Sequence, residues 1–201
     1  MVSTTRSVAW IKDDPPGIEF VEVALLPDRL GATGVAIGSA PIPYRLDYML
    51  ETTGGFVTVD MHVTAQGQGW KRSLALRRLP SGIWTAEVDA DGLVELPAAG
   101  GDLAALTDAF DCDLGLSPLT NSMPVLRHTP FSAGMSVDFV MAWISVPDLG
   151  VRMSGQRYTF VRAEGDGYII RYDALDSDFS ADITFDRDGL VVDYPGIGRR
   201  L

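Results

Sequence analysis

The residues best suited to chemistry are concentrated in one stretch, residues 111–127, which reads DCDLGLSPLTNSMPVLR. On a strand, Asp111 and Asp113 would share a face, where two carboxylates could serve acid–base or glycosidic chemistry. The same stretch supplies a hydroxyl, an amide and a guanidinium group, on Thr120, Asn121 and Arg127. Its two prolines argue against a regular central strand. The stretch is therefore either a tightly held connection between two halves of a β domain or part of the rim or floor of a binding cavity.

Other patterns that support catalysis or metal binding are sparse. The two histidines, His62 and His128, are far apart in the chain, and no HExxH or CxxC pattern occurs, so we predict no metal site. Ser117 lies in LGLSPL rather than in GxSxG, and Pro118 has no backbone N–H for an oxyanion hole. No glycine-rich run follows a strand and opens a helix, so we predict no cofactor. These residues favour a protein without catalytic groups.

Most of the remaining chain has the alternation and turn residues of β-strands. The first half contains strand candidates at residues 7–12, 18–26, 31–39, 44–52, 56–65, 70–79, 84–89 and 92–96. The second half contains candidates at residues 136–146, 151–163, 168–174, 179–185 and 190–194. The one predicted helix covers residues 102–110, with Asp102 as its N-cap. This mainly β pattern, with about a dozen strands, indicates a sandwich or an open antiparallel barrel-like fold.

The strand candidates form two meanders of similar size, residues 7–96 and 134–195. A helix and a loop at residues 97–133 join them. A chain of 201 residues can bury a substantial core, so we predict a single domain over residues 1–201.

The candidate strand at residues 136–146 is apolar on both faces. One face carries Val137, Phe139, Met141 and Trp143, and the other carries Val140, Ala142 and Ile144. Such a strand lies either between two layers of structure or with one face on the core and the other on an apolar cavity. A cavity of that kind would suit an acyl chain.

Composition excludes several partners and locations. The net charge of −11 repels phosphates, so we predict no nucleic-acid partner. The lone Cys112 cannot form an internal disulfide. The chain begins without an apolar signal segment, and no apolar run is long enough for a transmembrane segment. We therefore expect a cytoplasmic protein, and monomer and dimer both stay open as oligomeric states.

Several short segments of the chain resemble those of a known protein family. They are VAWIK (8–12), GIEF (17–20), YRLDY (44–48), GIW (82–84), DLGLSPLTNSMPVLR (113–127) and GLVVDYPGIGRR (189–200). Together they resemble the "putative glycolipid-binding" family, once a domain of unknown function. Ser122-Met123 and Val125-Leu126 depart from the Thr-Leu and Ile-Arg expected there, which leaves Arg127 as the one arginine of a usual pair. The resemblance implies a large curved antiparallel sheet, similar to lipid and lipoprotein carriers, with few helical elements.

The resemblance also implies a ligand. We predict non-enzymatic binding of a small amphipathic molecule, a glycolipid or fatty-acyl compound, with its tail in an apolar cavity inside the curved sheet. Hydroxyl, amide, carboxylate and guanidinium groups suit a sugar head group, which leads us to predict contacts from Asp111, Asp113, Thr120, Asn121 and Arg127. Further candidates in the second meander are Tyr158, Arg171 and Tyr172. The alternatives are a hydrolase of a lipid or sugar ester that uses Asp111, Asp113 or His128, and an interaction module with an empty pocket.

Overall fold

The computed structural model describes residues 3–129 and 132–201, and these residues form one fourteen-stranded sheet. The first seven strands are β1 (Thr4–Lys12), β2 (Gly17–Leu25), β3 (Leu30–Gly38), β4 (Tyr44–Thr53), β5 (Val57–Gly67), β6 (Trp70–Arg78) and β7 (Trp84–Gly92). The others are β8 (Asp111–Leu114), β9 (Ser136–Ile144), β10 (Val151–Glu164), β11 (Gly167–Ala174), β12 (Ser180–Phe185), β13 (Val191–Tyr194) and β14 (Gly198–Arg200). The helical elements are three 3₁₀ turns, η1 (Gly54–Phe56), η2 (Leu103–Leu106) and η3 (Leu119–Asn121), and one α-helix, α1 (Ser122–His128).

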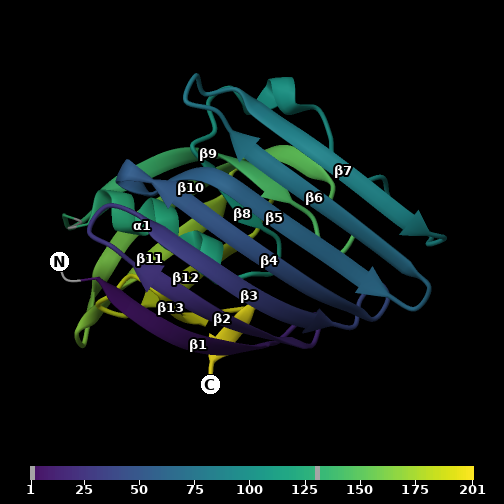
Figure 1. Cartoon of the computed structure of the whole chain (residues 1–201). Coiled ribbons are helices and arrows are strands. Elements are labelled where there is room, and N and C mark those ends of the chain that lie inside the picture. The colour runs from purple at the N-terminus through teal and green to yellow at the C-terminus, as the bar shows by residue number, and fades with distance from the viewer. Residues whose placement is uncertain (1–2, 130–131) are drawn as a thin grey trace.

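The sheet is a curved ribbon that does not close into a barrel (Figure 1). Its strand order is β7-β6-β5-β4-β3-β2-β1-β14-β13-β12-β11-β10-β9-β8. Neighbouring strands are antiparallel throughout, except that β8 and β9 are parallel. The two meanders join where β1 pairs with β14, with Trp10 opposite Arg200. The predicted large curved sheet of two meanders is therefore confirmed.

Aromatic side chains on the inner face of the first meander lie over glycines of neighbouring strands. Tyr48 is paired with Gly34 and Tyr44 with Gly38 in the β3–β4 register. A Cβ atom at Gly34 would lie 2.2 Å from Cζ of the Tyr48 ring. Glycine in a strand interior marks such close approach of a neighbouring group, here an aromatic ring. The small residues of β3 thus let large rings pack flat against the sheet.

Two hydrophobic clusters fill the concave side of the ribbon. The first covers β1–β7 and includes Ala142 and Ile144 of β9, and the second covers β10–β13 and includes Met141 of β9. β9 lies between the two clusters, and this position explains why both of its faces are apolar. Helix α1 bridges them in the same way, with Met123 in the first cluster and Val125 in the second.

Residues 111–127, the central segment, lie inside the fold between the two meanders. Almost every side chain from Asp111 to Val125 is buried, so the segment is an internal plug rather than a surface loop. The sequence predicted no helix here, yet α1 begins at Ser122. Pro124 lies in the first turn of α1, where a backbone N–H has no intrahelical partner, so it does not oppose the helix.

Other local predictions need correction. The helix predicted at residues 102–110 is reduced to the single turn η2, although Asp102 does cap it by accepting a hydrogen bond from the backbone N–H of Ala104 at 3.0 Å. The strand predicted at residues 92–96 is wrong, because β7 ends at Gly92 and irregular chain follows. Strands β8 and β14 were not predicted. No helix among the described residues is long and apolar enough to cross a membrane.

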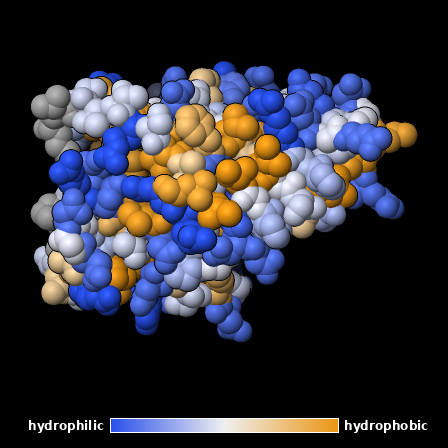
Figure 2. Space-filling model, turned by 90° about the horizontal axis from the view of Figure 1, so that it is seen from below, coloured by the Kyte–Doolittle hydropathy of each residue, from blue (hydrophilic) through white to orange (hydrophobic). Residues whose placement is uncertain are grey.

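The outer face of the first meander also carries apolar side chains. Ile11, Ile18 and Ile37 stand side by side across β1, β2 and β3, and each is more than one-third exposed. Figure 2 shows the molecule from below the view of Figure 1, and apolar side chains also gather in the middle of the side seen there. Apolar surface is therefore present outside the sheet as well as in its core.

Candidate ligand-binding pocket

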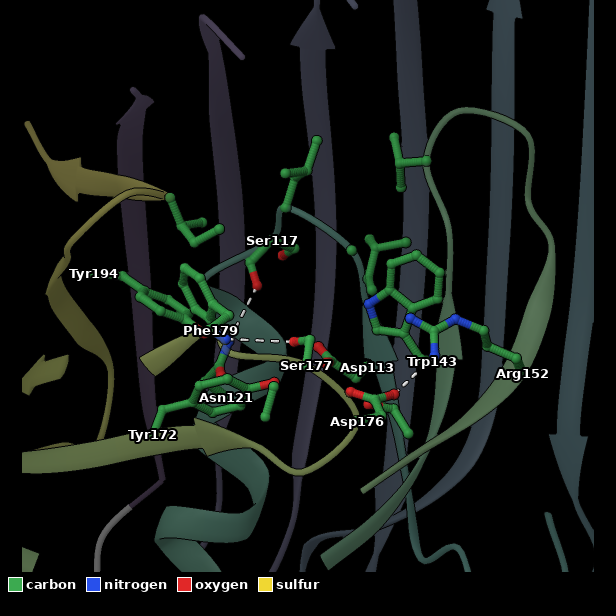
Figure 3. A pocket seen from close by; sticks show the side chains of 17 residues that line it. Asp113, Ser117, Asn121, Trp143, Arg152, Tyr172, Asp176, Ser177, Phe179 and Tyr194 are labelled. Carbon is green, nitrogen blue, oxygen red and sulfur yellow. Dashed lines mark hydrogen bonds and ion pairs between the residues drawn. The ribbon is translucent and has the colours of Figure 1, made fainter. Parts of the chain in front are cut away.

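A pocket of about 390 Å³ lies between the central segment and the second meander (Figure 3). The turn after β8 forms one side, and β9, β10, β11 and β13 with nearby turns form the other. Its polar lining consists of Asp113, Ser117, Asn121, Arg152, Ser154, Asp176 and Ser177. The rest of the lining consists of Leu114, Gly115, Leu116, Trp143, Val146, Tyr172, Ala174, Phe179, Tyr194 and Ile197. The pocket is therefore mixed in polarity, whereas the sequence predicted an apolar cavity.

A tight turn after β8 shapes one wall of the pocket. A Cβ atom at Gly115 would lie 3.0 Å from the carbonyl oxygen of Ile144, so a small residue fits best there. Leu116 follows with a φ of 63°, in the left-handed region that non-glycine residues rarely adopt. The backbone N–H of Ser117 then donates to the carbonyl of Leu114 at 3.0 Å and closes the turn. This path buries the Ser117 side chain and leaves Leu116 partly exposed on the wall.

A hydrogen-bond network forms the floor of the pocket. The Thr120 hydroxyl donates to Oδ1 of Asp113 at 2.8 Å, and Nε2 of Gln156 donates to Oδ2 of Asp113 at 2.6 Å. The Tyr158 hydroxyl lies 2.9 Å from Oδ1 of Asn121 and 3.2 Å from Oε1 of Gln156. Both carboxylate oxygens of Asp113 are thus held in place from two elements, η3 and β10. A carboxylate fixed in this way is ready to accept hydrogen bonds from a ligand.

The environment of Asp113 disfavours its charged form. Burial raises the pKa of Asp113 above its usual value, the hydrogen bonds from Gln156 and Thr120 lower it in part, and the charge of Asp111 raises it again. Within the described residues, Asp113 forms no ion pair with a lysine, arginine or histidine, and its two hydrogen bonds come from neutral groups. The floor of the pocket therefore holds a carboxylate without a protein counter-ion.

This raised pKa predicts how pH affects stability. The folded pKa of Asp113 lies above the unfolded value of about 3.9, so the folded state binds this proton more tightly. The stability contribution of Asp113 is therefore lost as pH rises through the window between the two values. Relative to an Asp113→Asn variant, the wild type should gain free energy of unfolding as pH falls from about 7 towards about 4. Urea unfolding at several pH values measures this difference, and a difference that does not change with pH would contradict the argument.

A tryptophan and an arginine form part of the rim. The guanidinium of Arg152 lies 4.4 Å from the centre of the Trp143 ring, and its Nη1 lies 2.9 Å from Oδ2 of Asp176 (Figure 3). Stacking on the ring and pairing with the carboxylate both restrain Arg152. Its charge is therefore already balanced at the rim.

Three further rings form an aromatic cluster on the pocket wall. The ring centre of Tyr172 lies 5.9 Å from that of Phe179 and 6.0 Å from that of Tyr194, and Phe179 and Tyr194 are 6.2 Å apart. Phe179 is 39% exposed, so its ring is available at the mouth. Flat apolar ring faces opposite a floor of hydrogen-bonding groups make a surface on which a sugar ring can stack while its hydroxyls are satisfied.

A buried charged network lies behind the turn. The Ser117 hydroxyl donates to Oε1 of Glu19 at 2.6 Å, and the Tyr48 hydroxyl donates to the same oxygen at 2.7 Å. The ammonium nitrogen of Lys12 lies 2.8 Å from Oε2 of Glu19, and all four side chains are buried. Burial, together with the charge of Glu19, raises the pKa of Tyr44 nearby to about 12. The first meander thus anchors the turn that forms the pocket wall.

Sequence reasoning missed Lys12 and Glu19 as members of this network, although a signal was present. Both lie at inward positions of their strands, in phase with apolar residues such as Trp10 and Val21. A charged residue in phase with a buried face needs a partner inside the protein. Phe179 and Tyr194 of the pocket, and Gln156 behind it, were also missed as site residues; they resemble ordinary strand and turn residues in the sequence. Trp143 was noted only as part of a strand face that could line a cavity.

The structure places Asp111 and Arg127 away from the pocket. Two nitrogens of Arg127 bind both carboxylate oxygens of Asp111, at 2.8 Å and 2.5 Å. Arg127 also donates to the carbonyl oxygens of Gly55 and Phe56, at 2.6 Å and 3.0 Å. Asp111 is 1% exposed, and Arg127 lines a separate hollow of about 440 Å³. This pair ties α1 and β8 to the start of β5.

The remaining predicted residues divide between the two sides of the sheet. Asp113, Asn121 and Tyr172 line the pocket. Thr120 and Tyr158 are buried behind it and hold Asp113 and Asn121. Arg171 lies on the outer face of β11, where it is about half exposed and pairs with Asp182 at 2.8 Å. The structure thus brings five of the eight predicted residues together and leaves three outside the pocket or on the other face.

The geometry does not support the hydrolase alternative. The Ser117 hydroxyl donates a hydrogen bond to Glu19. His128 lines the separate hollow with Arg127, and the centre of its ring lies 5.3 Å from that of Phe139, in an edge-on contact. Asp111 is paired with Arg127 and does not line the pocket, whereas Asp113 does. In the described part of the chain, no group of three His, Cys, Asp or Glu side chains is placed to hold a metal ion.

The chain thus forms an open curved β-sheet, with a pocket of polar and aromatic side chains between the central segment and the second meander. A family model described as "Putative glycolipid-binding" matches residues 7–200, and the chain belongs to this family. A solved structure of a DUF1089 family protein from Pseudomonas aeruginosa is similar, with 26% identity, a TM-score of 0.68, and coverage of 91% of this chain and 92% of that chain. The comparison with curated proteins found no significant match.

Proposed function

We propose that the protein binds an amphipathic glycoside without chemical conversion and holds its sugar in the 390 Å³ pocket. The observation that carries this proposal is the pairing of a fixed polar floor with an aromatic wall in one pocket. Asp113 and Asn121 offer oxygen and nitrogen atoms to sugar hydroxyls, and Trp143, Tyr172 and Phe179 offer ring faces. The description of the family, glycolipid binding, supports the same class of ligand.

The apolar tail of the ligand does not fit inside the curved sheet, where the sequence predicted it. The concave side of the ribbon is filled by the two hydrophobic clusters and by the central segment. Leu116, Val146 and Ile197 line the pocket and are partly exposed. We therefore place the tail at the mouth of the pocket, against these side chains, and the sugar below it.

Titration of the protein with octyl β-D-glucopyranoside below its micelle concentration, followed by calorimetry, tests the proposal. Replacing Phe179 by alanine removes a half-exposed ring from the pocket wall, and we expect affinity to fall about tenfold, or about 1.4 kcal/mol. Phe110→Ala is a matched control, because Phe110 is 51% exposed and lines the separate hollow with Arg127. It should leave affinity unchanged. Equal losses in both variants, or a loss in Phe110→Ala alone, would contradict the assignment of the pocket.

A further inference from the structure

Asp113 differs from the two most deeply buried carboxylates in having no cation. Glu19 is paired with Lys12 at 2.8 Å, and Asp111 with Arg127 at 2.8 Å. Asp113 receives only the neutral hydrogen bonds from its two holders on η3 and β10. A carboxylate removed from water without a cation is costly, and neutral hydrogen bonds offset only part of that cost. Of these three acids in the described part of the chain, the one that faces the pocket is the one without a cation from the protein.

The pocket itself does not supply that cation. Among the described residues, Arg152 is the one basic residue in the lining, and it is held by Asp176 at 2.9 Å and by the Trp143 ring. The lining therefore contains two carboxylates and one guanidinium, which leaves one negative charge in excess, at Asp113. A ligand that brings a positive charge would balance it.

The aromatic cluster also favours a ligand group with a positive charge. Ring faces attract cations within about 6 Å through their electron-rich centres. Burial raises the pKa of Tyr172, and the charge of Asp113 raises it further, as expected where the carboxylate and this side chain are neighbours. Tyr172 and Tyr194 therefore stay neutral and present their rings beside Asp113.

We propose that the ligand carries a protonated amine on its sugar, that is, an amino sugar with an apolar aglycone, and that Asp113 pairs with this amine beside Tyr172 and Phe179. This inference rests on the proposed function, because it names the head group that the same pocket takes. Charge-assisted hydrogen bonds are about twice as strong as neutral ones, so the amine distinguishes this ligand from neutral glycosides.

Calorimetry with three octyl glycosides tests the proposal: the 2-amino-2-deoxyglucoside, its N-acetyl form and the plain glucoside, at about pH 6.5 where the amine is protonated. The wild type should bind the amine at least about tenfold more tightly than either neutral glycoside. Asp113→Asn should abolish this preference. Asp182→Asn, which removes a carboxylate from the outer face of the sheet, should keep it.

Each contrary outcome has a separate meaning. If the neutral glycosides bind as tightly as the amine, or if the preference survives in Asp113→Asn, the amine inference is wrong while the proposed function stands. If none of the three glycosides binds, the proposed function fails as well.

A measurement on the wild type alone covers the case in which Asp113→Asn does not fold. As pH falls and Asp113 takes up its proton, the preference for the amine should disappear while affinity for the N-acetyl form stays constant. The other groups that face Asp113 are Asp111, which is paired with Arg127, and Tyr158, Tyr172 and Tyr194, whose raised pKa values keep them neutral. At the rim, the charged groups are Asp176 and Arg152, which are paired with each other at 2.9 Å. A preference that persists at low pH would overturn the proposal.

Discussion

Replacing Glu19 by glutamine is expected to lower the free energy of unfolding by about 3–5 kcal/mol, the cost of breaking a buried ion pair by removing one partner. Glutamine can still accept hydrogen bonds from Ser117 and Tyr48, but it cannot balance the charge of Lys12. The Lys12 side chain is 6% exposed, so its ammonium group would remain buried without a counter-charge. Chemical denaturation monitored by circular dichroism measures the loss.

Two controls separate this explanation from a general effect of substitution in β2. Glu22 lies on the same strand but faces outward and is exposed, so Glu22→Gln should change stability by less than about 0.5 kcal/mol. The double variant Lys12→Met with Glu19→Met removes both charges. Its loss in free energy of unfolding should be smaller than the sum of the losses in the single variants Lys12→Met and Glu19→Met. Additive losses in the double variant would show that the two charges are not coupled.

The Arg127→Met variant should lose a similar amount, about 3–5 kcal/mol, because Asp111 would be left 1% exposed without its cation. Arg127 also binds the carbonyl oxygens of Gly55 and Phe56, so the link between α1 and the start of β5 would be lost too. Thermal and urea unfolding measure the effect. The protein that remains folded should bind octyl glucoside with unchanged affinity, since Arg127 lies outside the pocket.

Arg171→Met is the matched control for Arg127. Arg171 also pairs with an aspartate, Asp182 at 2.8 Å, but the two side chains are 52% and 41% exposed. Exposed pairs contribute about 1 kcal/mol or less, so this variant should be nearly as stable as the wild type. A large loss in Arg171→Met, or a weakened affinity in folded Arg127→Met, would contradict the roles assigned to these arginines.

Strands whose inner and outer positions alternate were predictable from the sequence, and the elements in the central segment were not. In β12 the period of two identifies a half-buried strand directly, and in β5 it holds from Met61 onwards, whereas Thr58 is buried and Val59 is exposed beside a bulge in the β4–β5 pairing. The central segment has no such period, because it is buried on several sides. Pro124 was read as a sign of irregular chain, but in the first turn of α1 it is compatible with a helix.

For the pocket, residues that are close in sequence were easier to predict than residues brought together by strand pairing. Asp113, Thr120 and Asn121 belong to one short run, and their residue types suggested a polar site. Gln156 reaches Asp113 because β10 and β8 lie on either side of β9 in the sheet, which no local pattern reveals. Arg171 and Tyr172 are adjacent in sequence, yet they point to opposite faces because side chains alternate along β11.

The pairing of β1 with β14 has a consequence for how the chain folds. Each meander is built mainly from neighbouring hairpins, but this one seam joins residues such as Trp10 and Arg200 from opposite ends of the described chain. Such a contact forms late, since the long intervening chain must first be ordered. We therefore propose that the two meanders complete one folding unit only when the last strands have been synthesised. Until then, the edge of β1 that pairs with β14 has no neighbouring strand.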